Sequence, residues 1–126
     1  MSSEKRHTAH SNADDGGEYF QFLAFRWDVA KAQQIARTLP VRRLDPQPWY
    51  RLLSAVRLDE DHIAHADLER PLILVRIREV GGTALIIDGW HRLARARRDG
   101  VADLSAILLD EDQEFEVRIF GGEKSL

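Results

Sequence analysis

Residues 71–110 constrain the fold more than any other part of the chain. "PLILVRIREV" is typical of a strand, the following Gly-Gly pair of a two-residue hairpin turn, and "TALIID" of the returning strand. A glycine corner then precedes a predicted helix over residues 90–99, which Gly100 ends, and "VADLSAILLD" predicts another strand. This order of elements predicts an α+β domain with a small mixed β-sheet and flanking helices.

Shorter elements are predicted before this unit. The aromatic run over residues 19–27 predicts one strand, and Asp28 is placed to cap a helix that Pro40 ends. Residues 41–44 predict a short strand, and residues 50–56 predict one or two helical turns after a proline-rich turn. We expect these elements to complete one domain over residues 18–120.

The two ends of the chain differ from the middle. Residues 1–17 are polar and predict a disordered tail, whose histidines, His7 and His10, are also potential metal ligands. The acidic run over residues 110–116 predicts a solvated loop. The alternation of Phe115, Val117 and Ile119 then indicates either an edge strand or a partner-binding tail, and residues 121–126 predict a C-terminal tail.

Composition excludes several classes of function. The chain has 126 residues, 44% of them hydrophobic, which suits one globular domain. It has no cysteine, so disulfides, thiolate metal sites and thiol catalysis are excluded. Its formal net charge of −3 argues against sequence-independent nucleic-acid binding without excluding it. With no apolar run that predicts a membrane span or a signal peptide, we expect a soluble, cytoplasmic protein.

The corner "DGWHR", residues 88–92, combines groups that suit an anion. Backbone N–H groups at a helix start lack helical partners and favour negative charge, and glycine lets a ligand approach closely. Arg92 would clamp phosphate oxygens and His91 would donate to them. Trp90 would stack on a ligand if exposed or anchor the helix if buried, and Asp88 would contribute to the site or cap the helix.

The order of three motifs resembles the ParB/sulfiredoxin-like superfamily. The matching segments, within residues 38–109, are Pro40–Pro46, Pro71–Val75 and the corner formed by Gly89, His91 and Arg92. The resemblance implies a compact domain that binds nucleotide phosphates at the Gly-x-His-Arg corner. It suggests ATP, ADP or CTP as the ligand, with Mg²⁺ as a companion.

This chain departs from the characterised branches of that superfamily. Sulfiredoxins carry a cysteine where this chain has Trp90, so their sulfinic-acid chemistry is excluded. Partition-type ParB proteins carry an additional helix-turn-helix domain, for which this chain lacks the length. Members that act as serine kinases use a glutamate near the position of Asp45. A stand-alone member of the superfamily is therefore the expectation.

The sequence leaves the chemistry and the partners open. Asp45, Glu60 and Asp61 are weak candidates for a general base, and His62 with His65 has a spacing that metal ligands share. The leading hypothesis is a domain that binds a nucleotide or another phosphorylated small molecule, with or without phosphoryl transfer or nucleotide hydrolysis. The first alternative is a non-catalytic regulatory or partition-associated module. The second is a DNA-binding or nuclease role, in which Arg92, Arg95 and Arg98 would contact the phosphate backbone. A homodimer or a protein partner is compatible with all three.

Overall fold

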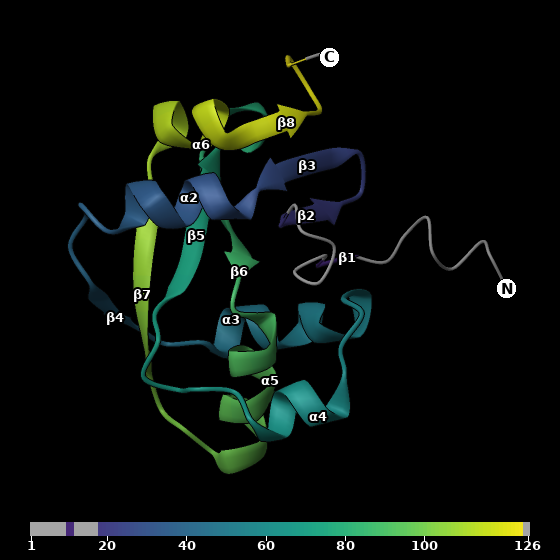
Figure 1. Ribbon diagram of the computed structural model, residues 1–126, viewed down its shortest axis with the longest axis vertical. Coiled ribbons are helices and arrows are strands. Elements are labelled where there is room, and N and C mark those ends of the chain that lie inside the picture. Colours follow the sequence, from purple (N-terminus) through teal and green to yellow (C-terminus); the bar gives the residue numbers. More distant parts are fainter. Residues whose placement is uncertain (1–9, 12–17, 125–126) are drawn as a thin grey trace, which may run out of the picture.

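The computed structural model describes residues 10–11 and 18–124 as two β-sheets with helices packed on them (Figure 1). The predicted α+β class is thereby confirmed. Most of the predicted tail, including His7, lies outside the described residues. The exception is β1 (His10–Ser11), which pairs with the strand that begins at Tyr19.

The larger sheet contains the strands predicted around the glycine corner. Its order is β4-β7-β5-β6, and the bounds are Arg42–Leu44 for β4, Leu72–Ile77 for β5, Thr83–Asp88 for β6 and Leu104–Leu109 for β7. β5 runs parallel to β7 and antiparallel to β6, so the helix between β6 and β7 forms the crossover between parallel neighbours. The sheet is therefore mixed, and the corner lies at the start of that crossover.

The turn between β5 and β6 is longer than the two residues predicted. β5 ends at Ile77, and a short 3₁₀ turn over Arg78–Val80 precedes the two glycines. Gly81 and Gly82 both have positive φ angles, +70° and +79°. The hairpin prediction is confirmed, but the strand does not continue to Val80.

The smaller sheet corrects one prediction. Its order is β1-β2-β3-β8, with β2 at Tyr19–Phe22, β3 at Phe25–Asp28 and β8 at Arg118–Phe120. The aromatic run is therefore not one strand but a tight hairpin that turns at Leu23, whose φ is +56°. Leucine rarely adopts this left-handed conformation, so the sequence carries no turn signal there.

The helices begin largely where their caps predict. α2 (Val29–Ala36) is capped by the Asp28 carboxylate, which accepts a hydrogen bond from the Lys31 backbone N–H. The remaining α-helices are α3 (Gln47–Tyr50), which a 3₁₀ segment (Arg51–Ala55) extends, α4 (Glu60–Ala64), α5 (Trp90–Asp99) and α6 (Glu111–Val117). α2 and α6 pack on the larger sheet, whereas α4 packs on α5 (Figure 1). α5 has the predicted bounds and is followed by Gly100 in the left-handed conformation.

One prediction near the C-terminus is wrong and another is right only in part. Residues 110–116 are not a solvated loop, because α6 occupies Glu111–Val117. An edge strand is present, but it is β8 (Arg118–Phe120) and does not include Phe115 or Val117. Asp110 and Gln113 form a capping box that starts α6. Glu114 is consequently turned inward and is fully buried.

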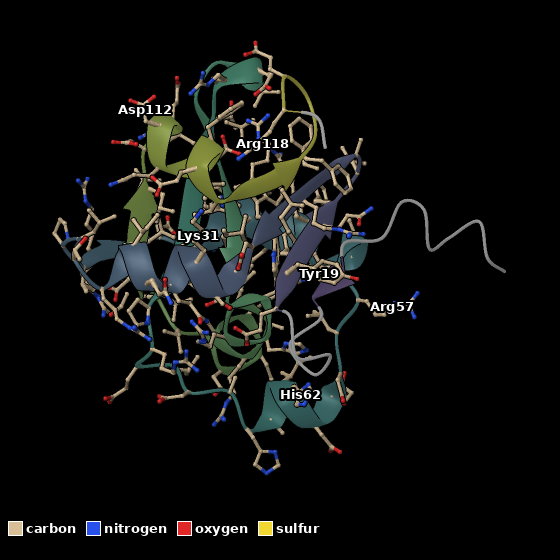
Figure 2. The ribbon with its side chains drawn as sticks, turned by 45° about the horizontal axis from the view of Figure 1, so that its top comes forward. Tyr19, Lys31, Arg57, His62, Asp112 and Arg118 are labelled. Carbon is tan, nitrogen blue, oxygen red and sulfur yellow. The ribbon has the colours of Figure 1, made fainter. Side chains whose placement is uncertain are left out.

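Arg118 joins the end of α6 to the rest of the molecule (Figure 2). Its guanidinium is fully buried, and all five of its N–H groups find acceptors. It forms bidentate contacts of 2.6–2.8 Å with the carboxylates of Glu79 and Glu114, and it also donates to the Gly121 carbonyl. The Trp27 indole N–H donates to Glu114 at 2.7 Å. This network connects the smaller sheet, α6 and the loop after β5.

Glu79 makes the stability of the fold sensitive to acid. The hydrogen bonds from Arg118 lower the pKa of Glu79 from 4.5 to about 2. Its stabilising contribution is therefore complete above pH 4.5 and is lost as the pH falls through the folded-state pKa. Between pH 5 and pH 2 we expect the protein to lose about 3 kcal/mol more unfolding free energy than the Glu79→Gln variant, as measured by urea denaturation.

A matched acidic residue provides the control for this prediction. Asp112 also contacts an arginine, Arg78, but its side chain is 97% exposed. The Asp112→Asn variant is expected to lose stability in acid as the wild type does. Equal losses in the wild type and Glu79→Gln would contradict the assigned role of the Arg118 contacts.

Candidate functional site

The corner between β6 and α5 requires glycine at position 89. Gly89 is the N-cap of α5 and has φ +105°. A β-carbon there would lie 2.5 Å from Leu72 Cδ2 and 3.0 Å from Arg92 Nη1. The chain can therefore turn from the sheet into the helix at this point only without a side chain.

The start of α5 leaves backbone donors without helical partners. The first helical hydrogen bond runs from the Leu93 N–H to the Gly89 carbonyl, and no side chain caps the helix. In contrast, aspartates cap α2, α4 and α6. Asp88 is therefore not the cap of α5, and the N–H groups of residues 90–92 point out of the helix with its positive dipole end.

A cavity of about 460 Å³ opens at this corner. Its walls come from the first turn of α5, the end of β6, α2, α4 and the loops on both sides of α4. The lining residues are Glu18, Gln33, Val56, Arg57, Leu58, His62, His65, Ala66, Asp67, Arg70, Ile87, Asp88, Gly89, Trp90, His91 and Arg92. All five residues of the predicted corner thus line one cavity.

The cavity carries cationic and acidic groups. Arg57 and Arg70 line it, and neither forms an ion pair with any residue that the structure describes. Figure 2 shows the Arg57 side chain projecting away from the body of the protein. Glu18 and Asp67 are acidic lining residues. The arrangement suits a ligand with an anionic group and separate hydrogen-bond donors.

Arg92 was predicted to bind phosphate oxygens, and in the structure its side chain also makes contacts within the protein. Its side chain is buried, and Nη1 donates to the backbone carbonyls of Arg70 and Pro71. Its Nη2 lies 3.7 Å from the Asp88 carboxylate, which also accepts a hydrogen bond from Gln33. Burial lowers the pKa of Arg92, and the charge of Asp88 opposes that effect. Arg92 therefore fixes the loop that carries Arg70 into the cavity wall.

His91 accepts a hydrogen bond, although the sequence predicts a donor. Its Nε2 accepts from the Asp59 backbone N–H at 3.1 Å, and its ring packs edge-on against His62 at 5.2 Å. Burial lowers the pKa of His91, and the neighbouring His62 and Arg92 lower it further. The imidazole is thus held in its neutral form near neutral pH.

Trp90 anchors the helix. Its side chain is 3% exposed, its indole N–H donates to the Ile86 carbonyl at 3.0 Å, and its ring stacks on Phe20. Of the two roles that the sequence left open, the buried anchor is the one that this geometry supports. Stacking of a base on the face of Trp90 is not available in this arrangement.

The three weak candidates for a general base lie elsewhere. Asp45 accepts from the Gln47 N–H and opens the turn into α3, Glu60 pairs with Arg98, and Asp61 lies on the exposed first turn of α4. None of the three lines the cavity. Asp88 is the predicted acidic residue that does line it.

Several lining residues carried no sequence signal for this site. Glu18, Gln33 and Arg70 come from segments distant in the chain, and only the fold brings them to the corner. His62 and His65 were noted for metal spacing. Within residues 10–11 and 18–124, however, no group of three or more histidines and carboxylates is placed to hold a metal ion. These residues do not fit a resident Mg²⁺, which would instead enter with the phosphates of a ligand.

A scan against protein-family models, a search of curated proteins and a search of solved structures each found no match. The superfamily resemblance therefore remains a prediction from the three motifs. In the part of the chain that the structure describes, no helix is long and apolar enough to span a membrane.

Proposed function

We propose that this protein binds a phosphorylated small molecule, with a nucleotide as the leading class, in the cavity at Gly89. The observation that carries the proposal is the opening of this cavity onto the uncapped start of α5. Backbone N–H groups with a helix dipole behind them form an anion site, and a cavity of this size suits a small ligand.

The residues that line the cavity would have different roles in binding the ligand. The N–H groups of residues 90–92 would hold phosphate oxygens, and Arg70 would supply a cation that no carboxylate in the described chain neutralises. Arg92 would hold the Arg70 loop in place through its two carbonyl contacts. The superfamily resemblance favours ATP, ADP or CTP as the ligand, together with Mg²⁺.

Binding without turnover is the second candidate, and one observation favours it. The side chain of Asp88, the predicted acid that lines the cavity, already contacts Gln33 and Arg92. A general base must reach the proton that it removes, and this carboxylate is engaged. This engagement favours a regulatory module that senses nucleotide over an enzyme that uses Asp88 as its base.

The contacts made by the arginines of α5 argue against the nucleic-acid alternative. Arg95 and Arg98 were the expected contacts to a phosphate backbone, together with Arg92. Arg95 instead donates to the Ala64 carbonyl and pairs with Asp99, and Arg98 pairs with Glu60. Few free cations remain on this helix for the many phosphate contacts that such binding needs.

A thermal-shift and calorimetric screen tests the proposal. We expect ATP, ADP or CTP to stabilise the protein by about 2.7 kcal/mol at a concentration of 100 times the Kd. Arg70→Ala should weaken binding about tenfold, because it removes a charge-assisted contact. Arg51→Ala, on an exposed arginine outside the cavity, is the matched control and should leave binding unchanged.

The same screen separates the two candidates. Stabilisation without release of phosphate or nucleoside diphosphate supports the binding module, whereas turnover supports an enzyme. No response to these nucleotides or to inorganic phosphate, with and without Mg²⁺, would contradict the proposed function.

A further inference from the structure

α4 forms one wall of the cavity and depends on α5 for its position. α4 has five residues, Glu60–Ala64, which is too short for a helix to be stable alone in water. His62 on this helix and His65 just after it line the cavity. Contacts with α5 therefore decide whether this wall is in place.

Two kinds of contact hold α4 against α5. Arg95 donates to the Ala64 carbonyl at 2.6 Å, and Arg98 pairs with Glu60 at 2.7 Å. Both contacts are made by arginine side chains of α5. A third contact, at the N-terminal end of α4, joins the Asp59 N–H to His91 Nε2, and this nitrogen can take up a proton.

The His91 contact requires a neutral imidazole. Nε2 accepts the Asp59 N–H at 3.1 Å, and a proton on that nitrogen would leave two donors facing each other. The His62 ring lies 5.2 Å from that of His91, and its charge lowers the pKa of His91, which opposes a proton on Nε2. Asp59, 3.7 Å from His62, is the acidic group on this side, and Arg92 adds positive charge from α5.

The sign of the pH effect follows from these neighbours. Burial, His62 and Arg92 lower the pKa of His91 below its usual 6.5, and the charge of Asp59 opposes them only in part. A group that prefers its neutral form in the folded state stabilises that state above its unfolded pKa. The stabilisation that the neutral His91 imidazole gives to the folded state is therefore lost as the pH falls below 6.5. The other charged residues that line the cavity with His91 are Glu18, Arg57, His65, Asp67, Arg70 and Asp88.

We propose that His91 forms a proton-operated latch that holds α4 against α5 at neutral pH and releases it in mild acid. Release loosens the cavity wall formed by His62 and His65 while α5 and the sheet remain folded. The latch is a property of the protein without ligand. Its consequence for ligand entry rests on the function proposed above.

Hydrogen exchange in the ligand-free protein tests the latch. Backbone amides 60–66 are compared at pH 7.5 and pH 5.5 after correction for the intrinsic exchange rate. We expect their protection to fall about tenfold at the lower pH, the size of effect that follows from losing about one hydrogen bond. Amides in β5 and β7 should keep their protection.

Two glutamine variants isolate the responsible ring. In His91→Gln the side-chain amide can still accept from Asp59 but does not titrate, so the protection of α4 should not depend on pH. His65→Gln is the matched control, because His65 lines the cavity but its ring nitrogen Nδ1 bonds the Asp61 carbonyl of α4 and not a group on α5. It should retain the wild-type fall.

Equal protection of α4 at both pH values in the wild type would overturn the latch, as would a persistent fall in His91→Gln. Because no ligand is present, neither result depends on whether the cavity binds phosphate. A separate titration with ADP at pH 7.5 reports on the proposed function alone.

Discussion

Replacing Arg118 with methionine is expected to destabilise the protein by about 3–5 kcal/mol, the loss typical when one partner of a buried ion pair is removed. The guanidinium and the Glu114 carboxylate are both fully buried. Among the residues that the structure describes, the Trp27 indole N–H is the donor that the Glu114 carboxylate would keep without Arg118. Urea denaturation at pH 7 measures the loss directly.

A surface ion pair supplies the control for this experiment. Arg43 pairs with Asp103, and both side chains are more than half exposed. Arg43→Met is expected to change stability by less than about 1 kcal/mol. Arg118→Lys should recover little, because an ammonium cannot contact two carboxylates in bidentate fashion. If Arg118→Met and Arg43→Met were equally mild, the buried network would not have the role assigned to it.

Substituting Gly89 with alanine is expected to cost about 2–4 kcal/mol, because it combines backbone strain with a steric clash. The added methyl group would lie 2.5 Å from Leu72 Cδ2, and Leu72 is itself fully buried in the sheet. The clash would also press on Arg92 Nη1, 3.0 Å away. Chemical denaturation measures the cost.

A Gly100→Ala variant distinguishes the cost of backbone strain from the cost of the steric clash at Gly89. Gly100 has φ +68° at the other end of α5, and an added β-carbon would have no heavy atom within 4 Å. Gly100→Ala should therefore cost only about 1 kcal/mol, the strain of a left-handed residue. Equal losses in the two variants would show that the corner is not sterically closed to a side chain.

The central unit was predictable because its signals are local. The apolar strand after Pro71, the glycine corner and the periodic helix closed by Gly100 each depend on neighbouring residues. The capping box of α6 was also present in the sequence, as Asp110 followed three residues later by Gln113. The strand-like alternation after residue 114 hid that signal.

Other parts of the fold could not be predicted locally. The β2-β3 hairpin turns at Leu23, a residue that favours no turn. Glu114 belongs to the run predicted as a solvated loop, yet it is buried in an ion pair with Arg118. Pairings of this kind become visible only once α6 and β8 have packed.

The candidate site also has one part that local sequence predicts and another that depends on long-range packing. The five corner residues 88–92 are contiguous in the chain, and they line one cavity as a unit. Arg70 and Glu18 reach that cavity through long-range packing, so no motif could have identified them. Arg92 donates to a backbone carbonyl and His91 accepts from a backbone N–H, and local sequence specifies neither of these protein partners.

The most direct test of the phosphate site is a nuclear magnetic resonance titration of the ¹⁵N-labelled protein with ADP, CTP and ATP at pH 7.5. If the start of α5 binds the phosphate group, the backbone amides of Trp90, His91 and Arg92 should show the largest shifts, and Arg70→Ala should reduce them. If these amides stay unmoved at millimolar nucleotide, or if the shifts fall on another surface, the assignment of the Gly89 corner is contradicted.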